Sequence, residues 1–244
     1  MIKRRIWILT LFPEYFRPLV ECGISGRAFR GERSEDIEFE LLFVNIRDYS
    51  TTKYKSVDDT PYGGGPGMIM RGDILRDALL KGVVEKGGYQ SHDDLQVIYT
   101  SPRGTLWNNV VARDFASKTL AHPTKDIVFL CGRYEGVDER FLEKYVTQFY
   151  SLGDFVLTGG ELAVMAMLDS SVRFVPGILG NKLSNVHDSF EDCLLEYPQY
   201  TRPLEFEGLP VPEILMSGHH KKIDEWKLQQ KKLMTQKWRK LSQE

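Results

Sequence analysis

Four glycine-containing segments of this 244-residue sequence have residue types and spacing that could hold a ligand. Three of them follow short β-rich runs, which places each at the carboxyl end of an expected strand. Ligands bind at that end of open α/β sheets, and glycine lets backbone groups approach a ligand closely. One such loop would indicate only a tight turn, whereas three together predict a shared pocket. The segments are 62–68 (Tyr-Gly-Gly-Gly-Pro-Gly-Met), 100–104 (Thr-Ser-Pro-Arg-Gly), 131–138 (Cys-Gly-Arg-Tyr-Glu-Gly-Val-Asp) and 157–161 (Leu-Thr-Gly-Gly-Glu).

Several common ligand chemistries are excluded by the same residues. No Gly-x-x-x-x-Gly-Lys-Ser/Thr loop occurs, and no Gly-x-Gly-x-x-Gly follows a first strand, which argues against a P-loop NTPase and a usual dinucleotide site. The histidines form no His-x-x-x-His pair, and the adjacent His219 and His220 would not share one helical face. The three cysteines are odd in number and widely separated in the sequence, a pattern that is typical neither of a disulfide framework nor of a zinc site. We therefore expect no metal at the chemical centre.

The elements that must position these loops alternate between strand-like and helix-like patterns. Such alternation predicts an α/β domain with a largely parallel sheet. Strands are expected at 6–12, 39–46, 96–100, 127–131 and 149–157, the last with a Gly-Asp interruption. Helices are expected at 14–30, with a glycine-containing break, and at 73–86, 108–118, 138–145 and 161–175.

A change of composition predicts a second, smaller domain. Pro176 and Gly177 must end the last helix of the first domain, so we expect domains at 1–178 and 188–244, joined by a polar linker at 179–187. Residues 188–213 carry seven acidic side chains and one arginine, whereas 221–244 carry eight Lys or Arg and three acidic side chains. Apolar residues in the basic segment suit one helical face. Its basic face is interpreted either as solvated surface or as an RNA-facing helix.

The lengths of the apolar runs and the spacing of the cysteines predict a cytoplasmic protein. No apolar run approaches the roughly 18–20 residues that span a bilayer, and the apolar run after the basic N-terminus is short and is followed by Pro13. Three widely spaced cysteines indicate a reducing compartment. The net charge of −2 permits RNA binding without implying it.

Motifs in a fixed order extend over nearly the whole chain. They occupy 11–13 (Leu-Phe-Pro), 59–68 (ending Gly-Gly-Gly-Pro-Gly-Met), 101–104, 131–140, 153–162, 188–190 (Asp-Ser-Phe), 200–203 (Tyr-Thr-Arg-Pro) and 215–220 (Leu-Met-Ser-Gly-His-His). In this order they resemble the bacterial tRNA (guanine-N1)-methyltransferases of the TrmD type, in the SPOUT class of knotted methyltransferases. The resemblance implies methyl transfer from S-adenosylmethionine to N1 of the guanosine immediately 3′ to the tRNA anticodon.

The same resemblance implies the architecture and the partners. The α/β domain would contain a deep trefoil knot, and the chain would form a homodimer with its active site at the subunit interface. A small helical C-terminal domain would help grip the tRNA anticodon stem-loop. No membrane partner is expected, and the sequence does not predict whether magnesium takes part.

The site residues are implied by matching positions to the family motifs. Asp188 corresponds to the general base, and Arg173 corresponds to the arginine that stabilises charge on the guanine. Asp188 and Glu191 also match a capping box, which would place the start of a helix at Asp188. The cofactor would contact Tyr99, Thr100, Ser101, Pro102, Gly132, Arg133, Tyr134, Glu135, Leu152, Gly153, Phe155, Leu157, Gly159 and Gly160.

An aspartate and an arginine suit the chemistry of guanine N1. This nitrogen carries a proton at neutral pH, so it has no free lone pair with which to attack a methyl group. A base must remove the proton, and a positive charge must stabilise the negative charge that would develop on O6. Asp188 and Arg173 would supply these two functions.

Two departures and two alternatives stay open. Glu196 and Gln199 stand where related sequences have an aspartate and a histidine, which leaves tRNA contacts there in doubt. One alternative keeps the fold and changes the substrate, to ribosomal RNA or a ribose 2′-hydroxyl. The other is a non-catalytic RNA-binding module. The aspartate, the arginine and the three cofactor loops argue against the second.

Overall fold

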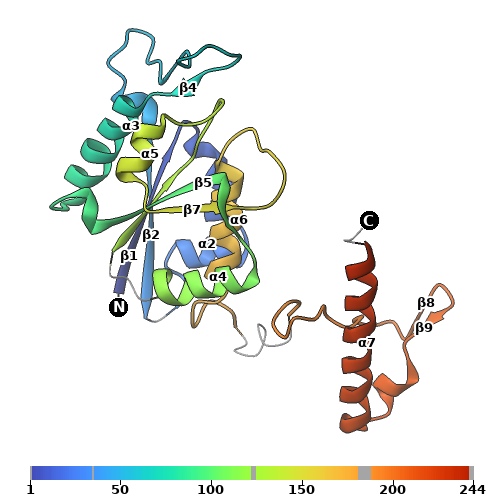
Figure 1. Ribbon diagram of the computed structural model, residues 1–244. Helices are drawn as coiled ribbons and strands as arrows, with labels where there is room; N and C mark the ends of the chain where they lie inside the picture. The colour runs from blue at the N-terminus through green and yellow to red at the C-terminus, as the bar shows by residue number, and fades with distance from the viewer. Residues whose placement is uncertain (1, 35, 122–124, 181–187, 242–244) are drawn as a thin grey trace. The chain divides into compact units, whose positions relative to one another are not determined.

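A computed structural model describes residues 2–34, 36–121, 125–180 and 188–241, and Figure 1 shows the ribbon. The chain divides into two compact units, Met1–Gly180 and Asn181–Glu244. The first unit is built on a five-stranded sheet in the order β2-β1-β6-β5-β7, with every neighbouring pair parallel. This architecture confirms the expected α/β class with a parallel sheet. The strands are β1 (Ile2–Thr10), β2 (Ile37–Asn45), β5 (Leu95–Leu106), β6 (Asp126–Leu130) and β7 (Gln148–Ser151).

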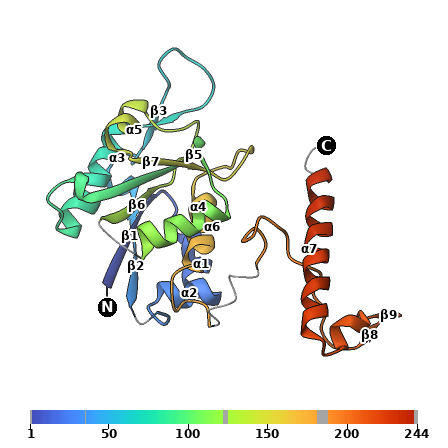
Figure 2. The same cartoon turned by 60° about the horizontal axis from the view of Figure 1, so that its bottom comes forward.

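Helices cover both faces of this sheet, as Figures 1 and 2 show. One face packs against α3 (Gly72–Leu79) and α5 (Glu139–Tyr145), and the other against α1 (Arg17–Glu21), α2 (Gly23–Phe29), α4 (Asn109–Phe115) and α6 (Glu161–Val172). In β1, Trp7 and Leu9 enter the first core while Ile6 and Ile8 enter the second. Successive side chains of a strand point to opposite faces. A strand buried on both faces therefore becomes a continuous apolar run.

The expected helices are present, with local irregularities. The segment predicted at 14–30 contains a 3₁₀ turn (Pro13–Phe16), α1 and α2, and the break lies at Gly23, whose φ is 68°. The helices α3 and α4 continue into π-helical turns at Leu80–Glu85 and Ala116–Leu120. These turns account for the greater lengths that the sequence predicted there.

Several predicted boundaries are wrong, among them the end of β5, which runs to Leu106 rather than to residue 100. Three of them have a clear local reason. β1 begins at Ile2 because Arg4, 1% exposed, donates to the Thr119 carbonyl (2.6 Å) and pairs with Asp126 (3.5 Å). β7 ends at Ser151 rather than at residue 157, because the Gly153 amide donates to the Ser151 hydroxyl in a turn. The helix expected to reach residue 175 ends at Val172, where hydrogen bonds of three-residue spacing replace the helical ones.

The second unit consists of one long helix, α7 (His220–Leu241), and the chain that leads to it. A short hairpin, β8 (Glu205–Phe206) and β9 (Leu209–Pro210), and a 3₁₀ turn (Glu213–Met216) precede the helix. The rings of Tyr197 and Tyr200 each lie 6.5 Å from that of Trp226. Of the expected linker, residues 181–187 lie outside the described part of the chain.

Candidate functional site

The carboxyl ends of β5, β6 and β7 meet with very close backbone contacts. The Gly160 amide donates to the Gly132 carbonyl at 2.9 Å, which joins the loop after β7 to the loop after β6. A Cβ added at Gly160 would lie 2.6 Å from Thr100 Oγ1 and 2.9 Å from the Cα of Cys131. Only glycine fits at such a distance from another backbone. The predicted glycine loops are therefore brought together at one edge of the sheet.

A cavity of about 230 Å³ lies among these loops. All fourteen positions that the family resemblance assigned to the cofactor line this cavity. That they contact a cofactor stays a prediction. Six further residues line the cavity, of which Gly136 and Thr158 belong to the glycine-containing segments that predicted the pocket, and the other four were missed. One of these four, Val156, lies between two predicted positions and could have been found there. The six are Gly136, Tyr150, Ser151, Val156, Thr158 and Ala163.

The cavity offers features that suit a small ligand with polar groups. Thr100 Oγ1 is buried and has no hydrogen-bond partner among the described residues. A buried hydroxyl without a partner is costly, and a bound ligand would relieve that cost. Tyr134 adopts a φ of 59°, which is uncommon for a residue with a side chain and occurs often at ligand sites. The wall of the cavity thus combines glycine backbone with an unsatisfied hydroxyl.

A buried ion pair joins Arg133, which lines the cavity, to Glu161 of α6. Arg133 Nη2 lies 2.9 Å from Glu161 Oε2, and these side chains are 13% and 1% exposed. Glu161 also accepts a hydrogen bond from the Thr10 hydroxyl (2.7 Å), while Arg133 Nη1 donates to the Thr158 carbonyl (3.1 Å). Glu161 is the first residue of α6, where a negative charge is also favoured by the helix dipole. The pair therefore fixes the loop after β7 against the loop after β6.

The charges of this pair act on neighbouring groups. Burial lowers the pKa of Arg133, but the hydrogen bonds and charges of Glu161 and Tyr15 raise it by more, so the guanidinium stays protonated. Its guanidinium carbon lies 4.6 Å from the ring centre of Phe12 and 5.2 Å from that of Tyr15, within the range of cation–π attraction. Burial raises the pKa of the Cys131 thiol well above its usual range, and the charge of Glu161 adds to this effect.

The Gly-Gly-Gly-Pro-Gly-Met segment is attached to the same loops. It lies between two short paired strands, β3 (Asp58–Asp59) and β4 (Ile69–Met70). The Glu135 amide donates to the Met68 carbonyl (3.0 Å), and the Met70 amide donates to the Gly136 carbonyl (2.9 Å). The Glu135 side chain occupies the space that a Cβ on Gly67 would need. The segment therefore begins and ends beside the cavity.

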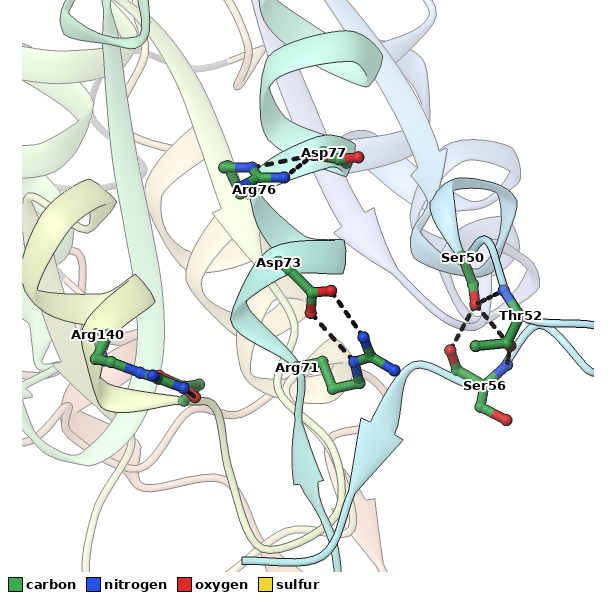
Figure 3. A network of polar contacts seen from close by, with 9 residues as sticks. Ser50, Thr52, Ser56, Arg71, Asp73, Arg76, Asp77 and Arg140 are labelled. Carbon is green, nitrogen blue, oxygen red and sulfur yellow. Dashed lines mark hydrogen bonds and ion pairs between the residues drawn. The ribbon is translucent and has the colours of Figure 1, made fainter. Parts of the chain in front are cut away.

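Polar contacts hold the base of this segment, as Figure 3 shows. The Ser50 hydroxyl donates to the Ser56 carbonyl (2.6 Å), and the Ser56 amide donates to the Thr52 hydroxyl (2.8 Å). At the other end, Arg71 pairs with Asp73 in the first turn of α3 (2.8 Å). These local contacts shape the backbone shortly before β3 and directly after β4.

The two residues predicted to be catalytic lie in different units. Arg173 is half-buried and follows the last residue of α6 in the first unit. Asp188 is partly buried in a turn of the second unit. The capping-box interpretation of Asp188 is wrong, because no helix of the described chain begins there; instead, the Glu191 amide donates to the Asp188 carbonyl (3.4 Å). Their catalytic roles stay predictions.

A second, larger hollow lies apart from the predicted site residues. A groove of about 760 Å³ runs beside β7 and α4, and it shares only Tyr150 with the glycine-lined cavity. None of the predicted site residues lines this groove. Among the described residues, no cluster of three His, Cys, Asp or Glu could hold a metal, and no helix is long and apolar enough to cross a membrane.

Comparison with known proteins identifies the family. Residues 4–243 match the family described as tRNA (Guanine-1)-methyltransferase TrmD. The chain therefore belongs to the TrmD family. A protein of Lactobacillus delbrueckii subsp. bulgaricus, named tRNA (guanine-N(1)-)-methyltransferase, is 47% identical over 220 residues, which cover 90% of this chain and 81% of the relative.

Two further relatives of the TrmD family carry the same name. The protein of Ruegeria sp. is 44% identical over 232 residues, covering 95% of this chain and 88% of the relative. That of Clostridioides difficile is 45% identical over 223 residues, covering 91% and 90%. The match spans both units, so the TrmD family resemblance is not limited to the glycine loops. As a member of this family, the chain is a methyltransferase.

Proposed function

We propose that this chain transfers the methyl group of S-adenosylmethionine to N1 of the guanosine immediately 3′ to the anticodon of tRNA. The observation that carries the proposal is the gathering of all fourteen expected cofactor positions around one cavity, in a chain of the TrmD family. The donor would supply an electrophilic methyl group on a sulfonium centre. The glycine backbone of the three loops and Thr100 Oγ1 would hold and orient it.

The acceptor is activated by side chains outside this cavity. We assign Asp188 as the general base that removes the N1 proton, and Arg173 as the cation that stabilises charge on O6. General base catalysis contributes about 10²–10⁴-fold. Alignment of the methyl donor with the acceptor nitrogen supplies much of the remainder.

The proposal includes a trefoil knot at the cofactor loops and a homodimer. Glycine-mediated contacts among the loops after β5, β6 and β7 suit a chain that threads tightly through itself. Near the cavity, Phe155 and Val156 are 55% and 88% exposed, and Leu162 of α6 is 49% exposed. Exposed apolar side chains of this kind favour an interface with a second subunit. In the homodimer, both subunits would contribute to each active site.

The second unit is proposed to bind the tRNA anticodon stem-loop. Eight Lys or Arg side chains lie between residues 221 and 244, against three acidic ones. A local concentration of positive charge attracts the phosphate backbone even where the net charge of the chain is −2. We place the reaction in the cytoplasm, where a reducing environment suits the three free cysteines.

Methylation with tritiated S-adenosylmethionine tests the proposal. Unmodified tRNA should accept label when a guanine follows the anticodon and should not when another base stands there. Label in a ribose, or transfer to ribosomal RNA alone, would point to a different substrate. Asp188→Ala should abolish turnover while leaving the affinity for S-adenosylmethionine nearly unchanged, and near-normal turnover in this variant would refute the assignment of the base.

A further inference from the structure

The buried face of α7 is polar. This helix of 22 residues has two buried side chains, Lys231 and Thr235, which are 8% and 3% exposed. They are four positions apart, so they lie on the same face of the helix. Burying an ammonium group costs free energy unless it is paired. A surface helix would be expected to bury leucine or isoleucine at these positions, so their polarity requires a specific reason.

Both side chains hold the segment that follows Asp188. Lys231 Nζ donates to Asp192 Oδ2 at 2.6 Å. The Leu195 amide donates to Thr235 Oγ1 at 2.8 Å, and this hydroxyl donates in turn to the Lys231 carbonyl at 2.7 Å. Lys231 and Thr235 therefore use their polar groups to attach residues 188–196 to the helix.

The attached segment is a closed turn with a defined shape. The Phe190 amide donates to the Leu194 carbonyl (2.7 Å), and the Glu196 amide donates to the Ser189 hydroxyl (3.0 Å). Phe190 and Cys193 adopt positive φ values of 75° and 62°, which make the turn tight. The Phe190 ring lies 5.8 Å from that of Trp238, which adds a third contact along the same helix face. Asp188 is the residue at which this turn begins.

The carboxylate of this pair is held in its charged form. Burial raises the pKa of Asp192, but the hydrogen bond and charge of Lys231 lower it by more, so the pKa lies below its ordinary value. Hydrogen bonds between two charged groups are shorter and stronger than neutral ones. Since Lys231 Nζ is buried and bonded to Asp192, it is poorly placed to bind an RNA phosphate, unlike the exposed Lys232 beside it.

We propose that Lys231, together with Thr235, is a positioning residue for Asp188. It fixes the turn at 188–196 on α7 and so sets where the carboxylate of Asp188 stands when substrate binds. The inference rests on the proposed role of Asp188 as the general base. A misplacement of about 1 Å in a catalytic group can reduce the rate by about 10²-fold. The effect should therefore fall on the chemical step rather than on cofactor binding.

Steady-state kinetics of the full-length protein test this inference. In Lys231→Met, kcat should fall by about 10–100-fold while KM for S-adenosylmethionine stays the same. Lys231→Arg should restore most of the loss, because it can still donate to Asp192. In the pH profile of kcat the plateau should fall without a shift of its acidic limb, since the base is displaced and not chemically altered. Lys232→Met removes the same charge from an exposed neighbouring position, and it should raise KM for tRNA without lowering kcat.

A second variant keeps the test decisive if Lys231→Met disturbs folding. Asp192→Asn changes a half-exposed side chain, and circular dichroism and thermal unfolding would show whether the fold is kept. A lower kcat in folded Asp192→Asn supports the inference. A kcat within about twofold of the parent, or a loss confined to KM for tRNA, overturns it. An active Asp188→Ala would refute the assignment of the base. An inactive Asp188→Ala together with a fully active Lys231→Met would refute only the positioning role of Lys231.

Discussion

Replacing Glu161 with glutamine should destabilise the first unit strongly while keeping the side-chain shape. The Glu161 side chain is 1% exposed and faces Arg133, whose side chain is 13% exposed. Glu161→Gln would leave an uncompensated cation behind the cofactor cavity. Breaking a buried ion pair costs about 3–5 kcal/mol. Arg133 would keep its hydrogen bond to the Thr158 carbonyl, its cation–π contacts with two rings and its small contact with water. We therefore expect the free energy of unfolding to fall by about 3 kcal/mol, the lower end of that range.

This free energy converts into a measurable shift of the melting temperature. For a unit of this size each kcal/mol corresponds to about 2–4 °C, so the first unit should unfold roughly 6–12 °C lower. Differential scanning calorimetry without and with S-adenosylmethionine would record the shift. The affinity for S-adenosylmethionine should also fall, because Arg133 packs against Gly159 and holds Thr158 at the cavity.

A matched control separates burial from the mere loss of an ion pair. Arg103 and Glu139 form a surface pair at 2.9 Å, with side chains 61% and 55% exposed. Exposed pairs contribute about 0–1 kcal/mol, so Glu139→Gln should lower the melting temperature by less than about 4 °C. Equal shifts in the two variants, or an unchanged melting temperature in Glu161→Gln, would refute the reasoning.

Three further outcomes follow from the same structure. Gly160→Ala should raise the Kd for S-adenosylmethionine by about tenfold or more in calorimetric titration, because its methyl group would meet backbone at 2.9 Å. Gly180→Ala is the control and should leave the Kd unchanged, because the nearest atom to its methyl group would be 3.7 Å away. An equal rise of the Kd in both variants would contradict the close-contact argument. Iodoacetamide should label the exposed Cys22 and Cys193 and spare Cys131 until the protein unfolds, because Cys131 is buried and its pKa is raised; equal labelling rates measured by mass spectrometry would count against this. The folded pKa of Asp192 is lowered from 3.8, so the stability it contributes is present above that pH and is lost as the pH falls through the folded value. Hydrogen exchange of α7 should therefore differ between the parent and Asp192→Asn near neutral pH and converge in acid, whereas a difference that persists in acid would mean that another interaction is responsible.

The sequence predicted the strands and helices of the first unit well because both faces of the sheet are covered. β6 is apolar from Ile127 to Leu130, and such a run bounded by turn residues is recognised without knowledge of its neighbours. The N-terminal end of β1 was missed because Lys3, Arg4 and Arg5 look like a solvated terminus. Their place in the strand depends on partners distant in sequence, such as Asp126, which lies 3.5 Å from Arg4.

The cavity was predicted more completely than the residues that support it. Glycines at strand ends mark close backbone approach in the sequence itself, so the loops could be found directly. The helix expected at 161–175 places Glu161 correctly at the start of α6, but the sequence does not predict its contacts with Arg133 and Thr10. No local pattern reports a partner 151 positions away. For the same reason, Lys231 was counted only as part of a basic segment.

The wall of backbone around the cavity has a consequence for inhibition. A molecule that competes with the methyl donor there would press against main-chain atoms of Gly132, Gly159 and Gly160, which no substitution can remove. Resistance by changing such a glycine would add atoms where its Cβ would already clash, for example 2.6 Å from Thr100 Oγ1. Such a change would distort the loops that the donor itself needs. Escape is therefore left to lining positions that carry a side chain, such as Phe155.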